Sequence, residues 1–250
     1  MPLLALLFAV LPGVAPPGSA ALIADADAAF FRIDYPAALA SYERALEIEP
    51  ASPEALWKLA RLYVCMAEVA TEPAQAACLV RAEEFARRCI HTDSTVADGY
   101  TWCAAALGYR ALNAPAAEKF DLSWEMMAAT DKALTLNPHD DGALSIRGSL
   151  YRALAGVGWL QRGLASLLFG EVPGGGFAEG EAALRQAMVL APDVMRHPYE
   201  LAGLYRDAGR MEEARRLLEH ASSLPVRVAI DRKRLHTIRE LLADPGLQEQ

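Results

Sequence analysis

Residues 198–224 read PYELAGLYRDAGRMEEARRLLEHASSL, and the pattern of this stretch decides the fold. Apolar and small residues recur every three or four positions on both sides of Gly209. This spacing predicts two amphipathic helices that are joined by a short turn at the glycine. Small residues such as Ala202 and Ala214 let the two helices approach closely, and a bulky residue such as Leu218 fills the space beside them. The stretch therefore predicts a helical hairpin.

The same spacing occurs in earlier parts of the chain. A small residue is followed by an aromatic residue or leucine, then by alanine, and then by proline. The residues are Ala38, Tyr42, Ala45 and Pro50 in one copy and Gly180, Leu184, Ala187 and Pro192 in another. Proline ends each helix before the next unit begins, and the pattern matches the 34-residue tetratricopeptide (TPR) helix-turn-helix repeat. We therefore predict an all-α fold, a TPR-like α-solenoid of about five helix pairs.

Two of the units are longer than the repeat consensus. The second carries about ten extra residues near 72–81, and the fourth carries about twenty before the glycine-rich stretch 170–176. Because the first insertion consists mostly of helix-forming residues, we expect elongated central helices. The segment 229–242 has leucine and isoleucine at helical spacing and predicts a C-terminal capping helix. We expect a single repeat domain over 21–245 and a tail at 246–250.

The N-terminal segment has the features of a signal peptide. Residues 1–20, MPLLALLFAVLPGVAPPGSA, form a short apolar run without a charged side chain. Pro12 interrupts this run, so a stable membrane span is not expected, and Gly18 and Ala20 have the spacing that a signal peptidase accepts. We predict cleavage after Ala20 or Ala21, which would make the protein exported, periplasmic or extracellular. The alternative is an uncleaved apolar segment that associates with a membrane.

Charge and motifs exclude several classes of function. The formal net charge is -8, and the sequence lacks the basic stripe that nucleic-acid-binding surfaces display, so nucleic acid is not an expected partner. The glycine run 174–176 is not followed by Gly-Lys-Ser or Gly-Lys-Thr, so a phosphate loop is not indicated. The histidines form no HExxH motif and no pair four residues apart. We predict no catalytic residue, no metal site and no cofactor.

The four cysteines leave two interpretations open. If the protein is exported, the cysteines become available for oxidation, and the break near Thr71 could bring Cys65 and Cys78 face to face as a disulfide. Cys89 and Cys103 form a second candidate pair. The alternative is that these cysteines are small buried residues of the repeat, because a free cysteine serves well in that position.

Longer motifs resemble the regulator of microtubule dynamics family. The likeness covers roughly residues 54–243 and is carried by WLQRGLASLLFGEVPGGGFAEGEAALRQAMVLAPD at 159–193 and ELAGLYRDAGRMEEARRLLEHASSLP at 200–225. Its most specific part is the LFG-x-x-P turn that ends at Pro173. The resemblance, which extends to bacterial-type relatives, implies a TPR-like helical fold and, for animal members, association with microtubules and membrane contacts. A net charge of -8 argues against the microtubule role here, since tubulin tails are acidic.

Aromatic residues and arginines at outward positions predict the surface that binds a partner. In a TPR superhelix the first helix of each pair lines the concave face. Aromatic side chains anchor peptides and arginines bind carboxylates. The predicted residues are Trp57, Arg61, Tyr100, Arg110, Arg152, Trp159, Arg162, Tyr199 and Arg206. The alternative is that the tryptophans are core wedges and the arginines pair with acidic residues on adjacent helices.

These observations predict a binding protein. We expect a non-enzymatic TPR-type scaffold or adaptor that binds a protein or peptide partner, one with acidic or carboxylate groups, in its concave groove. The alternative is a periplasmic small-ligand-binding TPR component that resembles that of TRAP transport systems. This alternative requires an enclosed pocket near Trp159 and Arg162.

Overall fold

The computed structural model describes residues 18–156 and 174–244, and over these two ranges the chain forms α-helices and turns without a β-strand. The all-α prediction is confirmed. The helices are α1 (Ser19–Phe31), α2 (Tyr35–Ile48), α3 (Pro53–Ala67), α4 (Ala74–Thr92), α5 (Ala97–Asn113), α6 (Ala116–Leu136), α7 (Asp141–Ala155), α9 (Phe177–Leu190), α10 (Arg196–Asp207), α11 (Met211–Ser222) and α12 (Ile230–Ala243).

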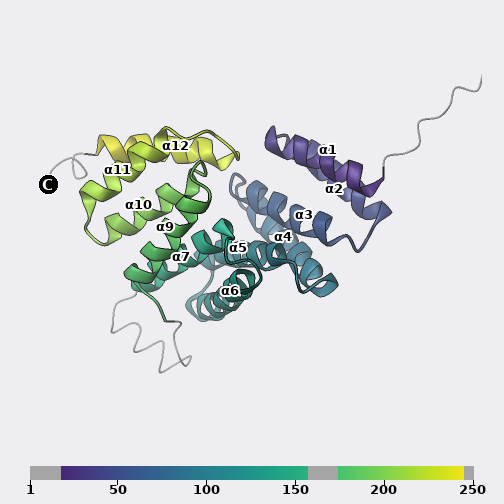
Figure 1. The fold of residues 1–250 in the computed structure, drawn as a ribbon, viewed down its shortest axis with the longest axis horizontal. Coiled ribbons are helices and arrows are strands. Elements are labelled where there is room, and N and C mark those ends of the chain that lie inside the picture. Colours follow the sequence, from purple (N-terminus) through teal and green to yellow (C-terminus); the bar gives the residue numbers. More distant parts are fainter. Residues whose placement is uncertain (1–17, 157–173, 245–250) are drawn as a thin grey trace, which may run out of the picture.

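The described helices pack as five pairs, followed by α12 (Figure 1). The pairs are α1–α2, α3–α4, α5–α6, α7–α9 and α10–α11, and α12 packs on α11. The second helices of the two central pairs are long, with 19 residues in α4 and 21 in α6, compared with 14 in α2 and 12 in α11. The predicted solenoid of five helix pairs with elongated helices and a capping helix is therefore confirmed, with the elongation seen in α4 and α6. The predicted insertion of the fourth unit lies mostly outside the described residues.

Side chains that the sequence places before the helices form their N-terminal caps. The Asp34 carboxylate accepts a hydrogen bond from the backbone N–H of Ala37 at 3.2 Å, and the Asp140 carboxylate accepts one from Ala143 at 2.9 Å. Such caps satisfy backbone donors that have no partner inside the helix. Gly209 has a φ of 75° in the turn between α10 and α11, a backbone conformation that glycine adopts without steric cost.

Small residues lie where neighbouring helices cross, as the repeat spacing predicts. Ala38 and Ala214 are fully buried. A Cβ atom added at Gly148 of α7 would lie 2.5 Å from Cγ of Leu184 on α9, and one added at Gly180 would lie 2.8 Å from Leu204 on α10. These distances are below van der Waals contact, so the helices can approach this closely only because the side chains are absent.

A larger residue at Gly148 is expected to separate α7 from α9. Gly148→Val should lower the free energy of unfolding by about 2–3 kcal/mol, because overpacking forces a backbone shift and valine gains little helix propensity. Urea denaturation of the purified protein measures this change. Gly174→Val is the matched control, since no atom lies within 4 Å of a Cβ at that position, and it should change stability by less than about 0.5 kcal/mol. Equal stability of the two variants would contradict the close approach at Gly148.

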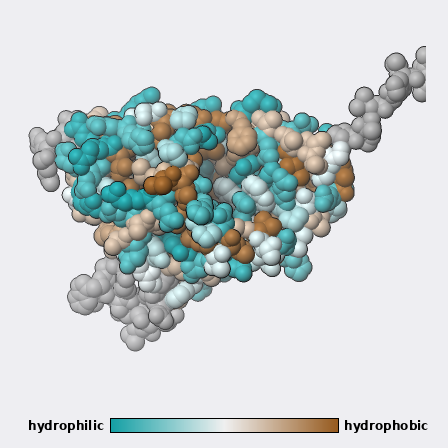
Figure 2. All heavy atoms as spheres, viewed as in Figure 1, coloured by the Kyte–Doolittle hydropathy of each residue, from teal (hydrophilic) through white to brown (hydrophobic). Residues whose placement is uncertain are grey.

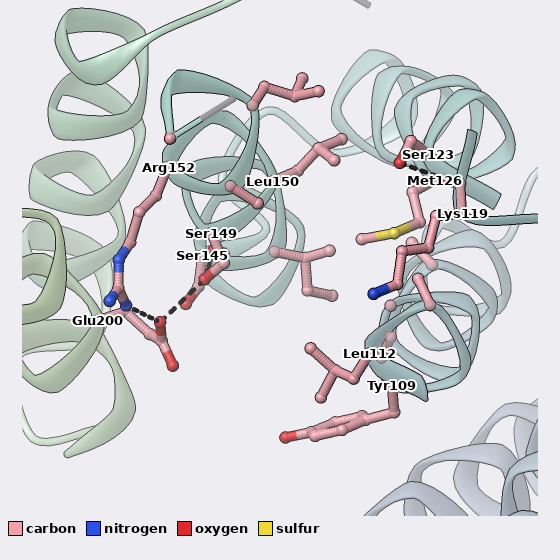
Figure 3. A pocket seen from close by; sticks show the side chains of 18 of the residues that line it. Tyr109, Leu112, Lys119, Ser123, Met126, Ser145, Ser149, Leu150, Arg152 and Glu200 are labelled. Carbon is pink, nitrogen blue, oxygen red and sulfur yellow. Dashed lines mark hydrogen bonds and ion pairs between the residues drawn. The ribbon is translucent and has the colours of Figure 1, made fainter. Parts of the chain in front are cut away.

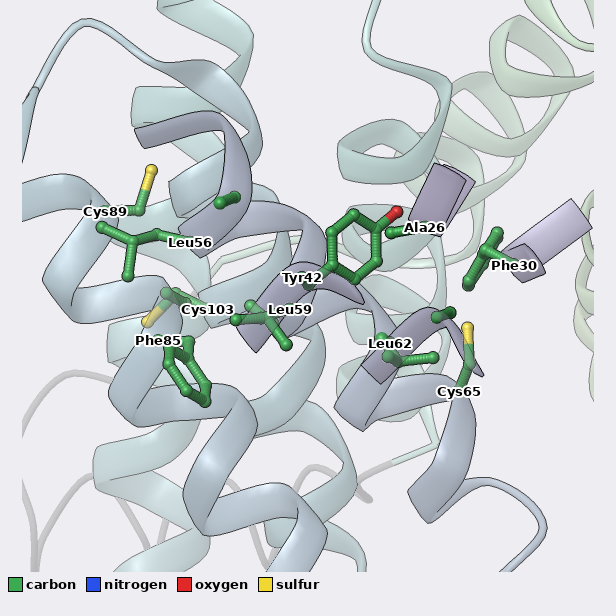
Figure 4. Packing of buried hydrophobic residues seen from close by; sticks show 14 of the residues in the cluster. Ala26, Phe30, Tyr42, Leu56, Leu59, Leu62, Cys65, Phe85, Cys89 and Cys103 are labelled. Atoms are coloured by element: carbon green, nitrogen blue, oxygen red, sulfur yellow. The ribbon is translucent and has the colours of Figure 1, made fainter. Parts of the chain in front are cut away.

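The largest hydrophobic cluster lies in the N-terminal half and contains three of the four cysteines (Figure 4). Cys65, Cys78, Cys89 and Cys103 are all free thiols, so the predicted disulfides Cys65–Cys78 and Cys89–Cys103 are not formed in the structure. Cys65 is buried in the cluster, where burial raises its pKa to about 12, whereas Cys78 is only half-buried on α4. The Cys89 thiol donates instead to the carbonyl oxygen of Pro53 at 3.4 Å. The buried cysteines therefore act as small core residues.

The capping helix returns to the first units of the solenoid. The backbone N–H of Ala229, just before α12, donates to the hydroxyl of Tyr35 on α2 at 3.0 Å. Arg234 of α12 forms an ion pair with Glu68, at the end of α3, at 3.1 Å. Figure 1 shows the start of α12 on the side of the molecule that faces α1 and α3. Contacts between residues far apart in sequence therefore join the two ends of the curved array.

The predicted signal peptide lies mostly outside the described residues. Helix α1 begins at Ser19, so the predicted cleavage after Ala20 or Ala21 falls within its first turn. Among the helices that the structure describes, none combines the length and the hydropathy that a membrane-crossing segment needs. The tail at 246–250 also lies outside the described residues.

Candidate functional site

A cavity of about 680 Å³, here called the central cavity, lies between α5, α6, α7 and α10. Helices α5, α7 and α10 are the first helices of their pairs and therefore belong to the concave side of a TPR array. On the face seen in Figure 2, apolar residues surround a hollow near the middle of the molecule. The volume of the central cavity lies in the range of protein sites that bind small molecules or short peptide segments.

The walls of the central cavity differ in chemistry. Small side chains of α5, including Ala104, Ala105 and Gly108, leave the space open, and Leu150 and Met126 add apolar surface. Tyr109, Lys119 and Ser123 lie on the side of Leu112 and Met126, and Figure 3 shows further polar groups on the opposite wall, which α7 and α10 form. These polar residues are Ser145, Ser149, Arg152, Arg196, Glu200 and Asp207. The wall of α7 and α10 is therefore the more polar one, and the wall of α5 and α6 combines apolar residues with Tyr109, Lys119 and Ser123.

Arg152 is the centre of the hydrogen bonds on the polar wall. Its Nε donates to Asp207 at 2.6 Å, and its guanidinium lies 3.6 Å from Glu200. Ser149 donates to Glu200 at 3.3 Å. A Cβ atom at Gly203 would lie 2.3 Å from the Arg152 guanidinium, so glycine at this position lets Arg152 lie against α10. Arg152 is therefore held in place by two carboxylates.

Arg196 differs from Arg152, because the described part of the chain contains no ion pair for it. Its Nε atom is buried without a hydrogen-bond partner, and so is the hydroxyl oxygen of Ser145. The side chains of both residues line the central cavity. Buried polar atoms are paired in most folded proteins, so this pair of unsatisfied donors marks the region around Arg196 and Ser145 as a candidate binding site.

His197 and Asp141 form a buried pair next to this region. His197 Nε2 lies 2.8 Å from Asp141 Oδ2, and the other ring nitrogen has no partner. Burial lowers the pKa of His197 despite the neighbouring carboxylate. Burial opposes ionisation of Asp141, but the hydrogen bond from His197 and the charges of His197 and Arg196 outweigh it and lower the pKa of Asp141. Neither residue lines the cavity, so the pair holds α7 against α10.

The structure brings few of the predicted binding residues together. Arg152 lines the central cavity, whereas Arg61 and Arg110 form ion pairs with acidic residues of the same chain and do not line it. Arg61 pairs with Asp27 at 3.2 Å and lies over the ring of Phe30, with the guanidinium carbon 3.9 Å from the ring centre. Both arginines follow the alternative that the sequence left open, namely pairing with acidic residues on adjacent helices.

The remaining predicted residues have other surroundings. Arg110 pairs with Glu83 and with Glu118. Trp57 packs against the N-terminal core, and the Tyr100 hydroxyl donates to the carbonyl oxygen of Ser94 at 3.3 Å. Tyr199 and Arg206 are half-buried on α10 and do not line the cavity. Trp159 and Arg162 lie outside the described residues.

Sequence reasoning missed Arg196, Ser145 and Lys119, which line the cavity. The face of α10 that meets the cavity carries residues 196, 200, 203 and 207 at helical spacing, and the prediction chose the adjacent face with Tyr199 and Arg206. The sequence did contain a pattern that could have identified this face, because these four positions place an arginine, two acidic residues and a glycine on one side of the helix.

Comparisons with known proteins agree with the fold. The family model described as "Regulator of microtubule dynamics protein 1-3" matches residues 22–246. The chain is 26% identical over 198 residues to regulator of microtubule dynamics protein 3 of Xenopus laevis, a match that covers 78% of this chain and 43% of that protein. It is 22% identical over 187 residues to regulator of microtubule dynamics protein 1 of Caenorhabditis elegans, a match that covers 75% of this chain and 83% of that protein. The chain thus spans less than half the length of the Xenopus relative.

Two solved structures are similar in fold. A thermophilic TPR protein of Thermus thermophilus matches with a TM-score of 0.65 and 22% sequence identity, over 89% of this chain and 100% of that one. PilW, a type IV pilus biogenesis factor, matches with a TM-score of 0.55 and 20% identity, over 92% of this chain and 88% of that one. At this level of identity, the similarity establishes a TPR-like fold.

Proposed function

Because this chain belongs to the regulator of microtubule dynamics protein 1-3 family and has a TPR-like fold, we propose that it is a non-enzymatic scaffold. In this proposal, a segment of a protein partner binds in the central cavity. The observation that carries the proposal is the cavity itself, which is bounded by α6 and by the first helices of three pairs, α5, α7 and α10, and which combines apolar surface with polar side chains. A preformed groove between helices does not have to become ordered when a segment binds, so binding avoids that entropic cost.

Charge favours a partner with acidic groups. The whole chain has a formal net charge of -8, but the described residues that line the central cavity include three cationic side chains and two acidic ones. The cationic residues are Lys119, Arg152 and Arg196, and the acidic ones are Glu200 and Asp207. A locally positive site on an acidic protein attracts carboxylates and disfavours cationic partners. Tubulin tails are acidic and would be repelled by a chain with a net charge of -8, so we do not extend the microtubule role to this chain.

The described polar residues beside the cavity give no specific support to a catalytic role. A nucleophile must lie within hydrogen-bond reach of its base. The Ser145 hydroxyl has no hydrogen bond, and the Nδ1 atom of His197 is also without a partner, so these two groups are not paired. In the described ranges, no group of three or more His, Cys, Asp or Glu side chains has a metal-binding arrangement. The small-ligand carrier finds no support and is not pursued, since Trp159 and Arg162 lie outside the described residues.

Filling the central cavity is expected to reduce partner binding. Ala153 is an exposed residue of the cavity lining on α7, so Ala153→Trp should place an indole in the cavity at little cost to the fold. The immobilised mature protein is used to capture partners from the native envelope fraction. We expect the amount of captured partner protein, measured by quantitative mass spectrometry, to fall at least tenfold in this variant. Ala182→Trp is the control, because Ala182 is exposed on α9 outside the cavity. Identical captured sets for both variants would show that the partner binds elsewhere.

Export is a separate part of the proposal. It is supported by the apolar, uncharged residues 1–20 and by the small residues Gly18 and Ala20. We expect the protein purified from its native host to lack the first 20 or 21 residues, and intact-mass measurement tests this directly. Recovery of the full-length mass from a membrane fraction would favour the uncleaved alternative.

A further inference from the structure

Helix α1 lies at the end of the repeat array, where the described part of the chain places no preceding helix pair against it. In the second pair, the first helix α3 packs against α2, α4 and α5, whereas α1 packs mainly against α2. Figure 1 shows α1 at the edge of the array. Repeat proteins normally end in a helix whose outer face is polar, because this face meets water. The residues on the outer face of α1 therefore indicate what covers it.

The outer face of α1 is less polar than water contact requires. Its exposed residues, here called the α1 face, are Ala24, Asp25, Ala28, Phe31 and Arg32. They recur at three- and four-residue spacing, so they share one side of the helix. Phe31 is 68% exposed, which leaves most of a large aromatic side chain in water. All five residues follow the predicted signal-peptide cleavage site, so cleavage leaves them in the protein.

The two charged residues of the α1 face are complementary to the same two residues in a second copy. Asp25 and Arg32 are exposed, and neither forms an ion pair within the described ranges. They are seven residues apart, which places them two turns and about 10 Å apart along one side of the helix. When two copies of α1 lie antiparallel about a twofold axis beside Ala28, Asp25 of each copy faces Arg32 of the other. One twofold arrangement therefore forms both ion pairs at once.

We propose that the α1 face binds the α1 face of a second copy of this chain, so that the protein forms a twofold-symmetric dimer. In this arrangement the Phe31 ring of each copy lies over Ala24 and Ala28 of the other, where small side chains leave room for it. Burial of these apolar side chains drives the association, and the two Asp25–Arg32 ion pairs fix its antiparallel orientation. The inference goes beyond the proposed function and does not depend on it, since α1 does not line the central cavity.

A second copy fits the α1 face better than a charged partner. The face contains one acidic and one basic side chain, so it has no net charge that would attract an anionic membrane or an acidic protein. Each charge is matched by its opposite in a second copy, which supplies the same pair in the reverse order. A face of five residues is smaller than the roughly 20–30 residues that each partner contributes to a standard interface. We therefore expect a weak, reversible dimer.

Sedimentation velocity of the purified protein, from micromolar to millimolar concentration at physiological salt, tests the association. We expect a reversible dimer for the unaltered chain. Asp25→Arg and Arg32→Asp should each raise the dissociation constant at least tenfold, because each substitution places like charges opposite each other at both ion-pair positions. Lys132→Asp is the matched control, since Lys132 is exposed on α6, which does not pack against α1. This variant should keep the dimer.

A mixture of the two single variants gives the most specific result. When a chain with Asp25→Arg meets a chain with Arg32→Asp, opposite charges face each other at both positions. The mixture should therefore form a heterodimer at a concentration at which each variant alone is monomeric. This recovery also shows that both variants are folded, so a loss of dimer in the single variants is not a loss of structure.

Three outcomes would contradict the proposal. The first is an unaltered chain that stays monomeric at every concentration. The second is a dimer that persists in both single variants, or a mixture that does not associate, since the interface would then lie outside the α1 face. The third is a monomeric chain that binds vesicles of zwitterionic lipid and loses this binding in Phe31→Ser, which would assign the α1 face to a membrane surface.

Discussion

Arg234→Ala is expected to lower the free energy of unfolding by about 3–5 kcal/mol, because it leaves buried carboxylates without their counter-ion. Arg234 pairs with Glu68 at 3.1 Å and with Asp231 at 2.8 Å, and all three side chains are less than one-tenth exposed. Tyr109 of α5 also donates to Glu68. Removing the arginine therefore disturbs contacts among α3, α5 and α12 at the same time.

The pairing can be separated from the volume of the side chain by a compensating variant. Denaturant unfolding, followed by circular dichroism, measures the loss in Arg234→Ala. The double variant Glu68→Gln with Arg234→Met removes the charges of Glu68 and Arg234 and keeps most of the volume, so it should recover part of the stability. The recovery is incomplete because Asp231 loses Arg234 and keeps only the hydrogen bonds from the backbone N–H groups of Arg227 and Val228. Arg239→Ala is the control on the same helix, since Arg239 is exposed, and it should change stability by less than about 0.5 kcal/mol. If Arg234→Ala unfolds at the same denaturant concentration as Arg239→Ala, the two ends of the array are not held together by this cluster.

Tyr42→Ala is expected to have a comparable effect through a different mechanism. Tyr42 is fully buried in the first pair, where its ring fills the space between helices (Figure 4). Its hydroxyl donates to Asp27 at 2.5 Å and accepts from Arg61 at 3.1 Å. Truncation of a large buried aromatic residue leaves a cavity and typically costs about 3–5 kcal/mol. The lost hydrogen bonds at Asp27 add to this cost.

A conservative variant separates the two contributions of Tyr42. Tyr42→Phe keeps the ring and removes the hydroxyl, so it should cost about 1–2 kcal/mol, which is smaller than the loss in Tyr42→Ala. Thermal unfolding and urea unfolding measure both variants. Tyr100→Ala is the control, because Tyr100 is half-buried and donates to an exposed backbone carbonyl. A Tyr42→Ala protein as stable as Tyr100→Ala would refute the role of Tyr42 as the wedge of its repeat.

The sequence by itself determined the helices and the way in which consecutive helices pair. The caps at Asp34 and Asp140 and the turn at Gly209 are local features, because each depends on residues within a few positions along the chain. The repeat spacing marks Tyr42 as a wedge, but its partners Asp27 and Arg61 lie on other helices. The close crossing at Gly148 follows from the same spacing. Local spacing was sufficient to predict the helices and their pairing, since a TPR unit buries its apolar face against its direct neighbours in sequence.

Only the tertiary structure decided which polar residues are available to a partner. Arg61 and Arg110 have the same outward register as Arg152, but acidic residues on other helices pair with them and remove them from the binding surface. The pairing of Glu68 with Arg234 joins residues 166 positions apart. Sequence spacing along one helix does not specify such pairs, because they depend on how far the array curves. That curvature sums small shifts at every helix interface, and it brings Arg196 of α10 to the lining of the central cavity.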